Sequence, residues 1–206
     1  MALSTYTELI SSVANALGND RNFVASVPDF ITLAEDKLNK RLRIRPMEVR
    51  ATASVTSEYV ALPTGFLAMR NFQINTSPRQ RLEYATPEYL DATYPSTSAT
   101  SVPLFYTLVG GEIQLAPVPD STYTAEMDYY QVWDIATDST NWLLTNAPRC
   151  YYYGALMEAS AFLASDKRIP VWASAFENAI REVEGADAKD RFPDFGLQMR
   201  PDVKPI

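Results

Sequence analysis

The chain has 206 residues, a formal net charge of −7, one cysteine and no histidine. This composition excludes sites that use a histidine base or ligand, an internal disulfide and a four-cysteine metal site. The acidic balance also argues against a broad nucleic-acid-binding surface, because nucleic acid phosphates would be repelled.

Residues 4–45 are predicted to form two helices. Thr5 and Glu8 have the spacing of a capping box, and apolar residues follow them at three- and four-residue steps. A second helix is expected to begin near Pro28 and to end before Pro46, with acidic residues early and basic residues late, as the helix dipole favours. Each helix has one apolar stripe that needs a partner.

Residues 47–145 change to a period of two, which predicts strands. Apolar and polar residues alternate most clearly in 49–55 and 123–129, and Gly110 with Gly111 forms a two-residue hairpin signal. Several short strands separated by turn signals predict an inserted antiparallel β-sandwich or barrel-like domain.

The chain then returns to a helical period. We expect a helix capped by Asn146, a short turn, and a last helix that ends near Gly185. Packing the N- and C-terminal helix pairs together is the simplest way to cover their apolar stripes. The predicted fold class is therefore α+β, with residues 1–46 and 146–186 forming a four-helix bundle that carries the inserted domain.

Residues 187–206 are expected to form an extended C-terminal arm, because the helical period stops and prolines recur. Segments of this kind either fold back on their own subunit or dock on a partner, and both alternatives stay open. The apolar residues of the arm are Phe192, Phe195, Leu197 and Met199.

Two groups of residues are predicted to contact other copies of the chain. The basic run from Lys37 to Arg50 favours ion pairs with an acidic neighbour, such as another copy, over nucleic acid binding, because its charges scatter around a helix end. Three consecutive tyrosines cannot all face one side of a helix, so at least one is expected on a protein–protein surface, with carbohydrate stacking as the competing use. The predicted contact residues are Arg41, Arg43, Arg45, Tyr151, Tyr152 and Tyr153.

No sequence motif predicts a catalytic, metal or cofactor site, and we expect none of the three. Glu126 and Asp128 are the best pair for acid–base chemistry, but a solvated sheet face is the simpler interpretation. Cys150 has no base beside it in the sequence and is expected to pack as a small apolar residue. No apolar run is long enough for a membrane helix, so we expect no membrane contact.

Five segments, read in order, resemble the head-to-tail adaptor (connector) proteins of tailed bacteriophages, particularly the short-tailed ones. Together they span about Val27 to Ile180, and they share packing and turn residues rather than a catalytic signature. The segments are VPDFITLAEDKLNKRLRIRPMEVRATA, YVALPTGFLAMRNFQI, LEYATPEYL, PLFYTLVGGEIQLAPVPDSTYTAEMDYYQ and NWLLTNAPRCYYYGALMEASAFLASDKRIPVWASAFENAI.

The resemblance implies a structural protein of the virion, made in the cytoplasm of the host bacterium, and not an enzyme. Copies would form a ring, typically of twelve, between the portal protein and the tail nozzle or tube. DNA would pass through the lumen without sequence-specific binding, and the C-terminal arm would reach the portal. The alternative function is a carbohydrate-binding module that uses the aromatic residues of the inserted domain.

Overall fold

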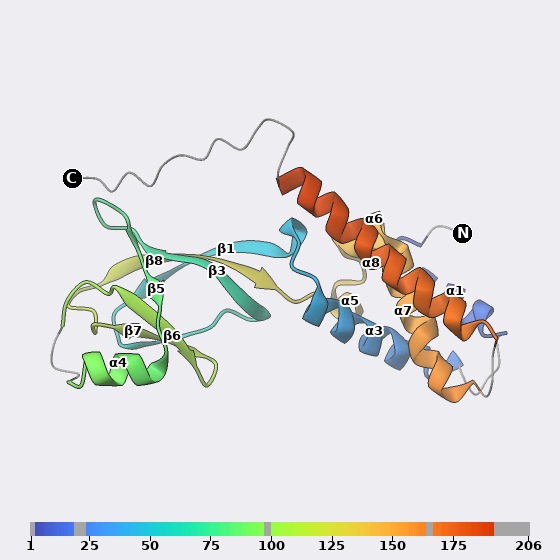
Figure 1. The fold of residues 1–206 in the computed structure, drawn as a ribbon, viewed down its shortest axis with the longest axis horizontal. Coiled ribbons are helices and arrows are strands. Elements are labelled where there is room, and N and C mark those ends of the chain that lie inside the picture. The colour runs from blue at the N-terminus through green and yellow to red at the C-terminus, as the bar shows by residue number, and fades with distance from the viewer. Residues whose placement is uncertain (1–2, 19–23, 97–99, 164–166, 192–206) are drawn as a thin grey trace. The chain divides into compact units, whose positions relative to one another are not determined.

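The structure is a computed structural model that describes residues 3–18, 24–96, 100–163 and 167–191. The chain divides into two compact units. Unit 1 is helical and consists of Met1–Pro46 and Trp133–Ile206, and unit 2 consists of the strand-rich segment Met47–Val132 (Figure 1).

The helices of unit 1 begin at recognisable capping residues. The predicted capping box is present at α1, where the Thr5 hydroxyl accepts from the Glu8 N–H and the Glu8 carboxylate accepts from the Thr5 N–H. The second predicted helix is α3, which has Pro28 in its first turn and Lys40 and Arg41 in its last. The helices are α1 (Tyr6–Ala16), α3 (Val27–Arg41), α5 (Ile135–Asp138), α6 (Trp142–Asn146), α7 (Pro148–Ala159), the 3-10 turn η2 (Ser160–Phe162) and α8 (Ile169–Arg191).

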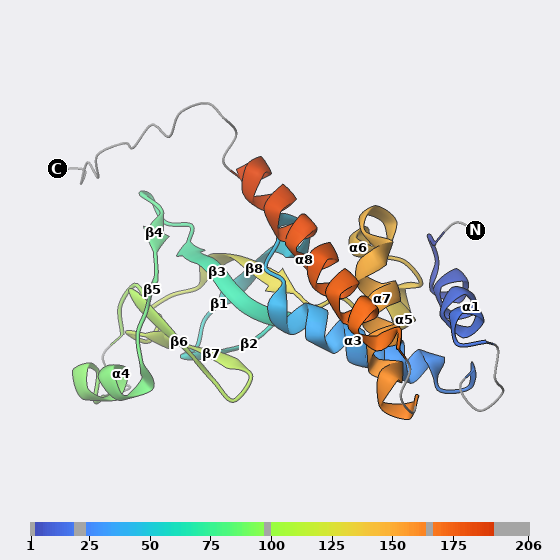
Figure 2. The ribbon, with the colours of Figure 1, turned by 45° about the vertical axis from the view of Figure 1, so that its right-hand side comes forward.

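Helix α7 lies at the centre of unit 1 and packs against α1, α3, α6 and α8 (Figure 2). Its Gly154 faces both α3 and α8, because a Cβ atom added there would be 2.9 Å from Ala34 Cβ and 3.0 Å from Phe176 Cε2. The absence of a side chain at this position therefore sets the spacing of three helices. None of the helices within the described ranges is long and apolar enough to span a bilayer.

The α+β class is confirmed, but the four-helix bundle is wrong. The helix expected after an Asn146 cap is α7, which begins at Pro148 after Ala147 (φ −141°, ψ 60°) and has no side-chain cap, whereas the short helix α6 directly before it is not expected from the sequence. Asn146 is the last residue of α6, and its side chain donates to Trp142 O at 2.8 Å. The described helices α1, α3, α6 and α8 all pack against the central helix α7, which differs from the arrangement of a four-helix bundle.

The observed boundaries of two segments also differ from the expected ones. The inserted domain is expected to end at residue 145, whereas unit 2 ends at Val132 and α5 and α6 belong to unit 1. Helix α8 continues through Gly185 to Arg191, so 187–191, expected in the arm, are helical. An ion pair of 2.5 Å between Asp187 and Arg191 stabilises this additional turn.

Unit 2 consists of two four-stranded sheets, with strand orders β1-β8-β3-β4 and β2-β7-β6-β5. All pairs are antiparallel except β5 with β6, which is parallel and departs from the antiparallel expectation. The predicted turn at Gly110 and Gly111 joins β6 to β7, with φ angles of 60° and 90° that favour glycine. The elements are β1 (Glu48–Val55), β2 (Tyr59–Ala61), β3 (Phe66–Ile74), β4 (Gln80–Arg81), β5 (Glu83–Tyr84), α4 (Pro87–Thr93), β6 (Phe105–Val109), β7 (Glu112–Ala116) and β8 (Tyr123–Gln131).

The two sheets share one hydrophobic core. One passage of the chain from the first sheet to the second is at the buried Leu82, between β4 and β5. Inward-facing residues of both sheets meet in the core: Val55, Phe72, Ile74, Leu82, Ile113, Leu115, Ala125, Met127 and Tyr129.

Candidate functional site

The chain leaves unit 1 once and returns to it once, and both passages are bonded to helices of unit 1. We call residues 42–46 the outgoing link and residues 133–135 the return link. The way in which these links are held is the first question that the fold raises.

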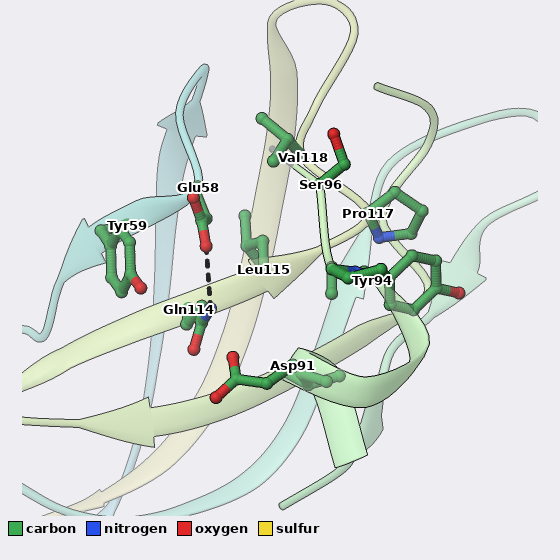
Figure 3. A pocket seen from close by; sticks show the side chains of 12 residues that line it. Glu58, Tyr59, Asp91, Tyr94, Ser96, Gln114, Leu115, Pro117 and Val118 are labelled. Atoms are coloured by element: carbon green, nitrogen blue, oxygen red, sulfur yellow. Dashed lines mark hydrogen bonds between the residues drawn. The ribbon is translucent and has the colours of Figure 1, made fainter. Parts of the chain in front are cut away.

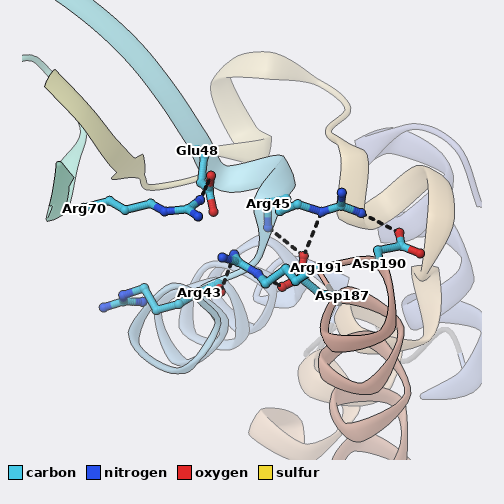
Figure 4. Close-up of polar contacts among 7 residues, drawn as sticks. All are labelled: Arg43, Arg45, Glu48, Arg70, Asp187, Asp190 and Arg191. Carbon is cyan, nitrogen blue, oxygen red and sulfur yellow. Dashed lines mark hydrogen bonds and ion pairs between the residues drawn. The ribbon is translucent and has the colours of Figure 1, made fainter. Parts of the chain in front are cut away.

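Helix α8 holds the outgoing link (Figure 4). The Arg45 N–H donates to Asp187 Oδ1 at 2.8 Å, and the Arg45 guanidinium pairs with Asp190 at 2.6 Å. Arg191 donates to the carbonyl oxygen of Arg43 at 3.4 Å and to the Asp187 carboxylate at 2.5 Å. Asp187 is thus the acceptor shared by the link and the end of the helix.

The electrostatics of Asp187 match this role. Partial burial by itself raises the pKa of the Asp187 carboxyl, but the hydrogen bonds from the Arg45 N–H and the Arg191 guanidinium outweigh it, and the pKa lies below its usual range. The folded unit 1 therefore favours the ionised form of this carboxyl.

The predicted basic contact residues all lie near this link. Arg41 donates to both carboxylate oxygens of Glu177 at 2.8 Å, and Arg43 donates to the carbonyl oxygens of Asn39 and Leu42 at 2.7 and 2.5 Å. The acidic neighbour expected for the basic run is thus α8 of the same chain for Arg41 and Arg45. A role for these residues between copies stays a prediction.

Helix α3 holds the return link through two polar residues spaced four apart. The Asn39 side chain donates to Trp133 O at 2.9 Å and accepts from Trp133 N–H at 3.0 Å, as a backbone partner would. One helical turn earlier, the Glu35 carboxylate accepts from Ile135 N–H at 3.0 and 3.2 Å.

Glu35 also belongs to a buried hydrogen-bond chain. The Tyr151 hydroxyl donates to Glu35 Oε1 at 2.7 Å and accepts from Asn141 Nδ2 at 2.6 Å, and the Asn141 Oδ1 caps α6 through Leu144 N–H. Glu35 is 7% exposed and Tyr151 is fully buried. Burial raises the pKa of Glu35 to about 6, although the bonds from Tyr151 and Ile135 act to lower it.

The three consecutive tyrosines therefore separate into two environments. Tyr151 lies in the core, so its hydroxyl serves the Glu35 network and not the subunit surface. Tyr152 and Tyr153 are half-buried and pack edge to face at 5.2 Å between ring centroids, and their contact with another copy stays a prediction. Cys150 is buried, and burial raises the pKa of its thiol to about 12.

Unit 2 has a polar pocket of about 410 Å³ between α4, β7 and the start of β2 (Figure 3). Its wall includes Tyr59, Asp91, Tyr94 and Gln114, and Gln114 Nε2 donates to Glu58 Oε1 at 2.8 Å. No cationic side chain of the described residues lines this pocket. Its carboxylates and aromatic rings suit a ligand that donates hydrogen bonds.

The carboxylates Glu126 and Asp128 are tied to neighbouring strands. Glu126 pairs with Arg50 at 2.6 Å and accepts from Gln73 at 3.1 Å, and Asp128 accepts from Asn71 at 3.4 Å. The hydrogen bond from Arg50 lowers the pKa of Glu126, which is unsuited to a general acid. Glu126 is 5% exposed, so the expectation of a solvated face is wrong at this residue.

The remaining predicted contact residues, Phe192, Phe195, Leu197 and Met199, lie outside the described residues. Sequence reasoning missed Glu35 and Asn39, although a signal for Glu35 is present. Glu35 lies at helical spacing between the core residues Ile31 and Leu38, so a carboxyl interrupts an otherwise apolar stripe.

Comparison with known proteins identifies the family. The family model described as SU10 adaptor protein matches residues 4–201, which include most of both units. A search of curated proteins found no match. The resemblance to phage head-to-tail adaptors is confirmed by the family match, and the chain belongs to the SU10 adaptor protein family.

Proposed function

We propose that this protein is a structural component of a bacteriophage virion, located at the junction of head and tail. Copies of the chain form a ring, expected to contain twelve, that binds the portal protein on one side and the tail nozzle or tube on the other. The family match over residues 4–201 is the observation that carries this proposal.

The anchored links support a mechanical role. A single flexible linker would let unit 2 move without loading unit 1. Here the outgoing link is bonded to α8 at Asp187, and the return link is bonded to α3 at Glu35 and Asn39. A force on either passage is therefore taken up by long helices that share α7 as a packing partner.

The charge of the chain supports passage of DNA without retention. The net charge is −7, and the ion pairs of Arg41, Arg45 and Arg50 within the chain leave fewer cations for phosphate contacts. We expect DNA to pass through the lumen without sequence-specific binding.

The test is assembly of the full chain with and without purified portal rings. Native mass spectrometry and negative-stain electron microscopy are expected to show rings of this chain on the portal. A chain that stays monomeric and unbound at micromolar concentrations of both proteins would contradict the proposal. Loss of portal binding on deletion of residues 192–206, with the ring intact, would assign the portal contact to the arm.

Carbohydrate binding is a second candidate function, favoured by the pocket of unit 2. Tyr59 and Tyr94 provide ring faces, and Glu58, Asp91 and Gln114 provide hydrogen-bonding groups among the lining residues (Figure 3). A glycan array is expected to give a signal that Asp91→Ala and Tyr94→Ala abolish. An array without signal for the folded chain would remove this candidate.

A further inference from the structure

Unit 1 has an apolar groove beside the C-terminal half of α8. Two adjoining cavities of about 450 and 440 Å³ have Trp142 and Ala186 in common, so they form one continuous depression. We call it the Trp142 groove. Its walls include the apolar residues Ala147, Pro148 and Val183 and the charged residues Arg45, Arg149, Glu182, Asp187 and Asp190.

The groove has the character of a docking site. Trp142 is 41% exposed, whereas most large apolar side chains of unit 1 are buried. The alanines at positions 147, 179 and 186 leave space beside the indole for an incoming ring. Tryptophan is enriched among the residues that dominate binding energy, because it offers a large apolar area with little entropy loss.

The position of the groove points to its occupant. Asp187 and Asp190, in the last turns of α8, form part of the wall, and Phe192 directly follows the end of this helix at Arg191. Phe195 comes three residues later, within about 13 Å of extended chain from Arg191.

The end of α8 is also fixed in place. The bonds of Asp187 and Arg191 to the outgoing link hold the start of the following segment at the edge of the groove. A segment tethered so closely has an effective concentration in the millimolar range or above, which favours it over the same segment of a separate copy.

We propose that the Trp142 groove binds the side chains of Phe192 and Phe195 of the same chain. This inference goes beyond the proposed function, because it concerns the isolated subunit and requires no portal. It leaves Leu197 and Met199, farther along the segment, for contact with a partner.

Fluorescence of Trp142 tests the proposal in the full chain. Trp133→Phe and Trp172→Phe leave Trp142 as the only tryptophan, and Phe192→Ser with Phe195→Ser is then added to this background. The expected result is a red shift of Trp142 emission and a several-fold rise in acrylamide quenching. The matched control, Leu197→Ser with Met199→Ser, is expected to leave both unchanged.

Three outcomes would overturn the proposal. The first is an unchanged Trp142 emission in the Phe192/Phe195 variant, and the second is an equal effect of the control pair. The third is quenching that depends on protein concentration, because the groove would then bind the segment of another copy. If the two tryptophan substitutions impair folding, hydrogen exchange of residues 142–146 in the otherwise native chain replaces fluorescence. We then expect several-fold faster exchange in the Phe192/Phe195 variant and no change in the Leu197/Met199 control variant.

Discussion

Glu35 shows how one polar residue in an apolar stripe organises its surroundings. It lies in the core face of α3 and accepts hydrogen bonds from the backbone of Ile135 and from Tyr151. A buried carboxyl is costly unless its oxygens are satisfied. The return link and Tyr151 supply these bonds, and the carboxyl in turn fixes where the chain re-enters unit 1.

This residue predicts a pH dependence of stability. The pKa of Glu35 is raised to about 6 in the folded chain. Its contribution to the free energy of unfolding is therefore fully present below the pKa that Glu35 has in the unfolded chain, and it is lost as the pH rises through about 6. The difference corresponds to about 2 kcal/mol in the free energy of unfolding. Glu35→Gln, whose single oxygen can accept from Ile135 and Tyr151, is expected to remove this dependence.

The measurement is urea unfolding of the wild type and of Glu35→Gln at pH 5 and pH 7.5. Glu88→Gln, in the first turn of α4 in unit 2, is the control and should follow the wild type. The same change with pH in Glu35→Gln and in the wild type would show that Glu35 does not titrate in this range.

Two glycines in helices give opposite predictions. A Cβ at Gly154 would meet Ala34 Cβ at 2.9 Å, and a Cβ held by backbone cannot move aside cheaply. We expect Gly154→Ala to lower the free energy of unfolding by about 1–3 kcal/mol. Gly185 has no atom within 4 Å of the corresponding position, so Gly185→Ala should raise it by about 0.5–1 kcal/mol. Equal effects of the two substitutions in thermal unfolding would contradict this account of packing.

At the scale of elements, the outgoing link and the end of α8 stabilise each other. Asp187 is 11% exposed and joins the Arg45 N–H to Arg191, whereas Asp190 is 67% exposed and, within the described part of the chain, pairs with the Arg45 guanidinium. Asp187→Ala is expected to lower the free energy of unfolding by about 1–3 kcal/mol, because the partly buried Arg191 Nε–H loses this acceptor. Asp190→Ala should cost less than about 1 kcal/mol.

Chemical unfolding measures the decrease in the free energy of unfolding for each variant. Hydrogen exchange of Arg45 and of residues 187–191 shows whether the loss is at the outgoing link and the end of α8. Faster exchange is expected in the Asp187 variant and little change in the Asp190 variant. If both variants exchange alike, the shared carboxylate does not hold the link.

The helices and strands could be predicted from the sequence wherever local signals decide. The Thr5 cap, the acidic-to-basic order of α3 and the glycine turn between β6 and β7 are of this kind. Helix α6 and the continuation of α8 past Gly185 could not be predicted, because tertiary contacts override a weak local preference there. The four-helix bundle was wrong because only two pairs of helices were expected, whereas α5 and α6 also belong to unit 1.

At the scale of the whole molecule, the family was predicted from the order of packing and turn segments, and the site only in part. The basic run was recognised as a source of ion pairs, and Arg41 and Arg45 do form them. Their partners lie at positions 177–190, far away in the sequence, so no local pattern connects the two ends. Glu177 and Asp190 occur in α8 at ordinary solvent-exposed positions, and only the fold brings them to α3 and the outgoing link.

The assembly role of Arg41 can be separated from its role within the subunit. Arg41→Glu is expected to weaken ring assembly on the portal at least tenfold, because it removes a half-exposed cation and places two carboxylates side by side. The double variant Arg41→Glu with Glu177→Arg restores an ion pair of opposite polarity inside the chain. If Arg41 also contacts another copy, this double variant regains the stability of the monomer in urea unfolding but not assembly, as measured by native mass spectrometry with portal rings. Recovery of both would confine Arg41 to its own subunit, since the pair with Glu177 would then account for the whole effect of the single charge reversal.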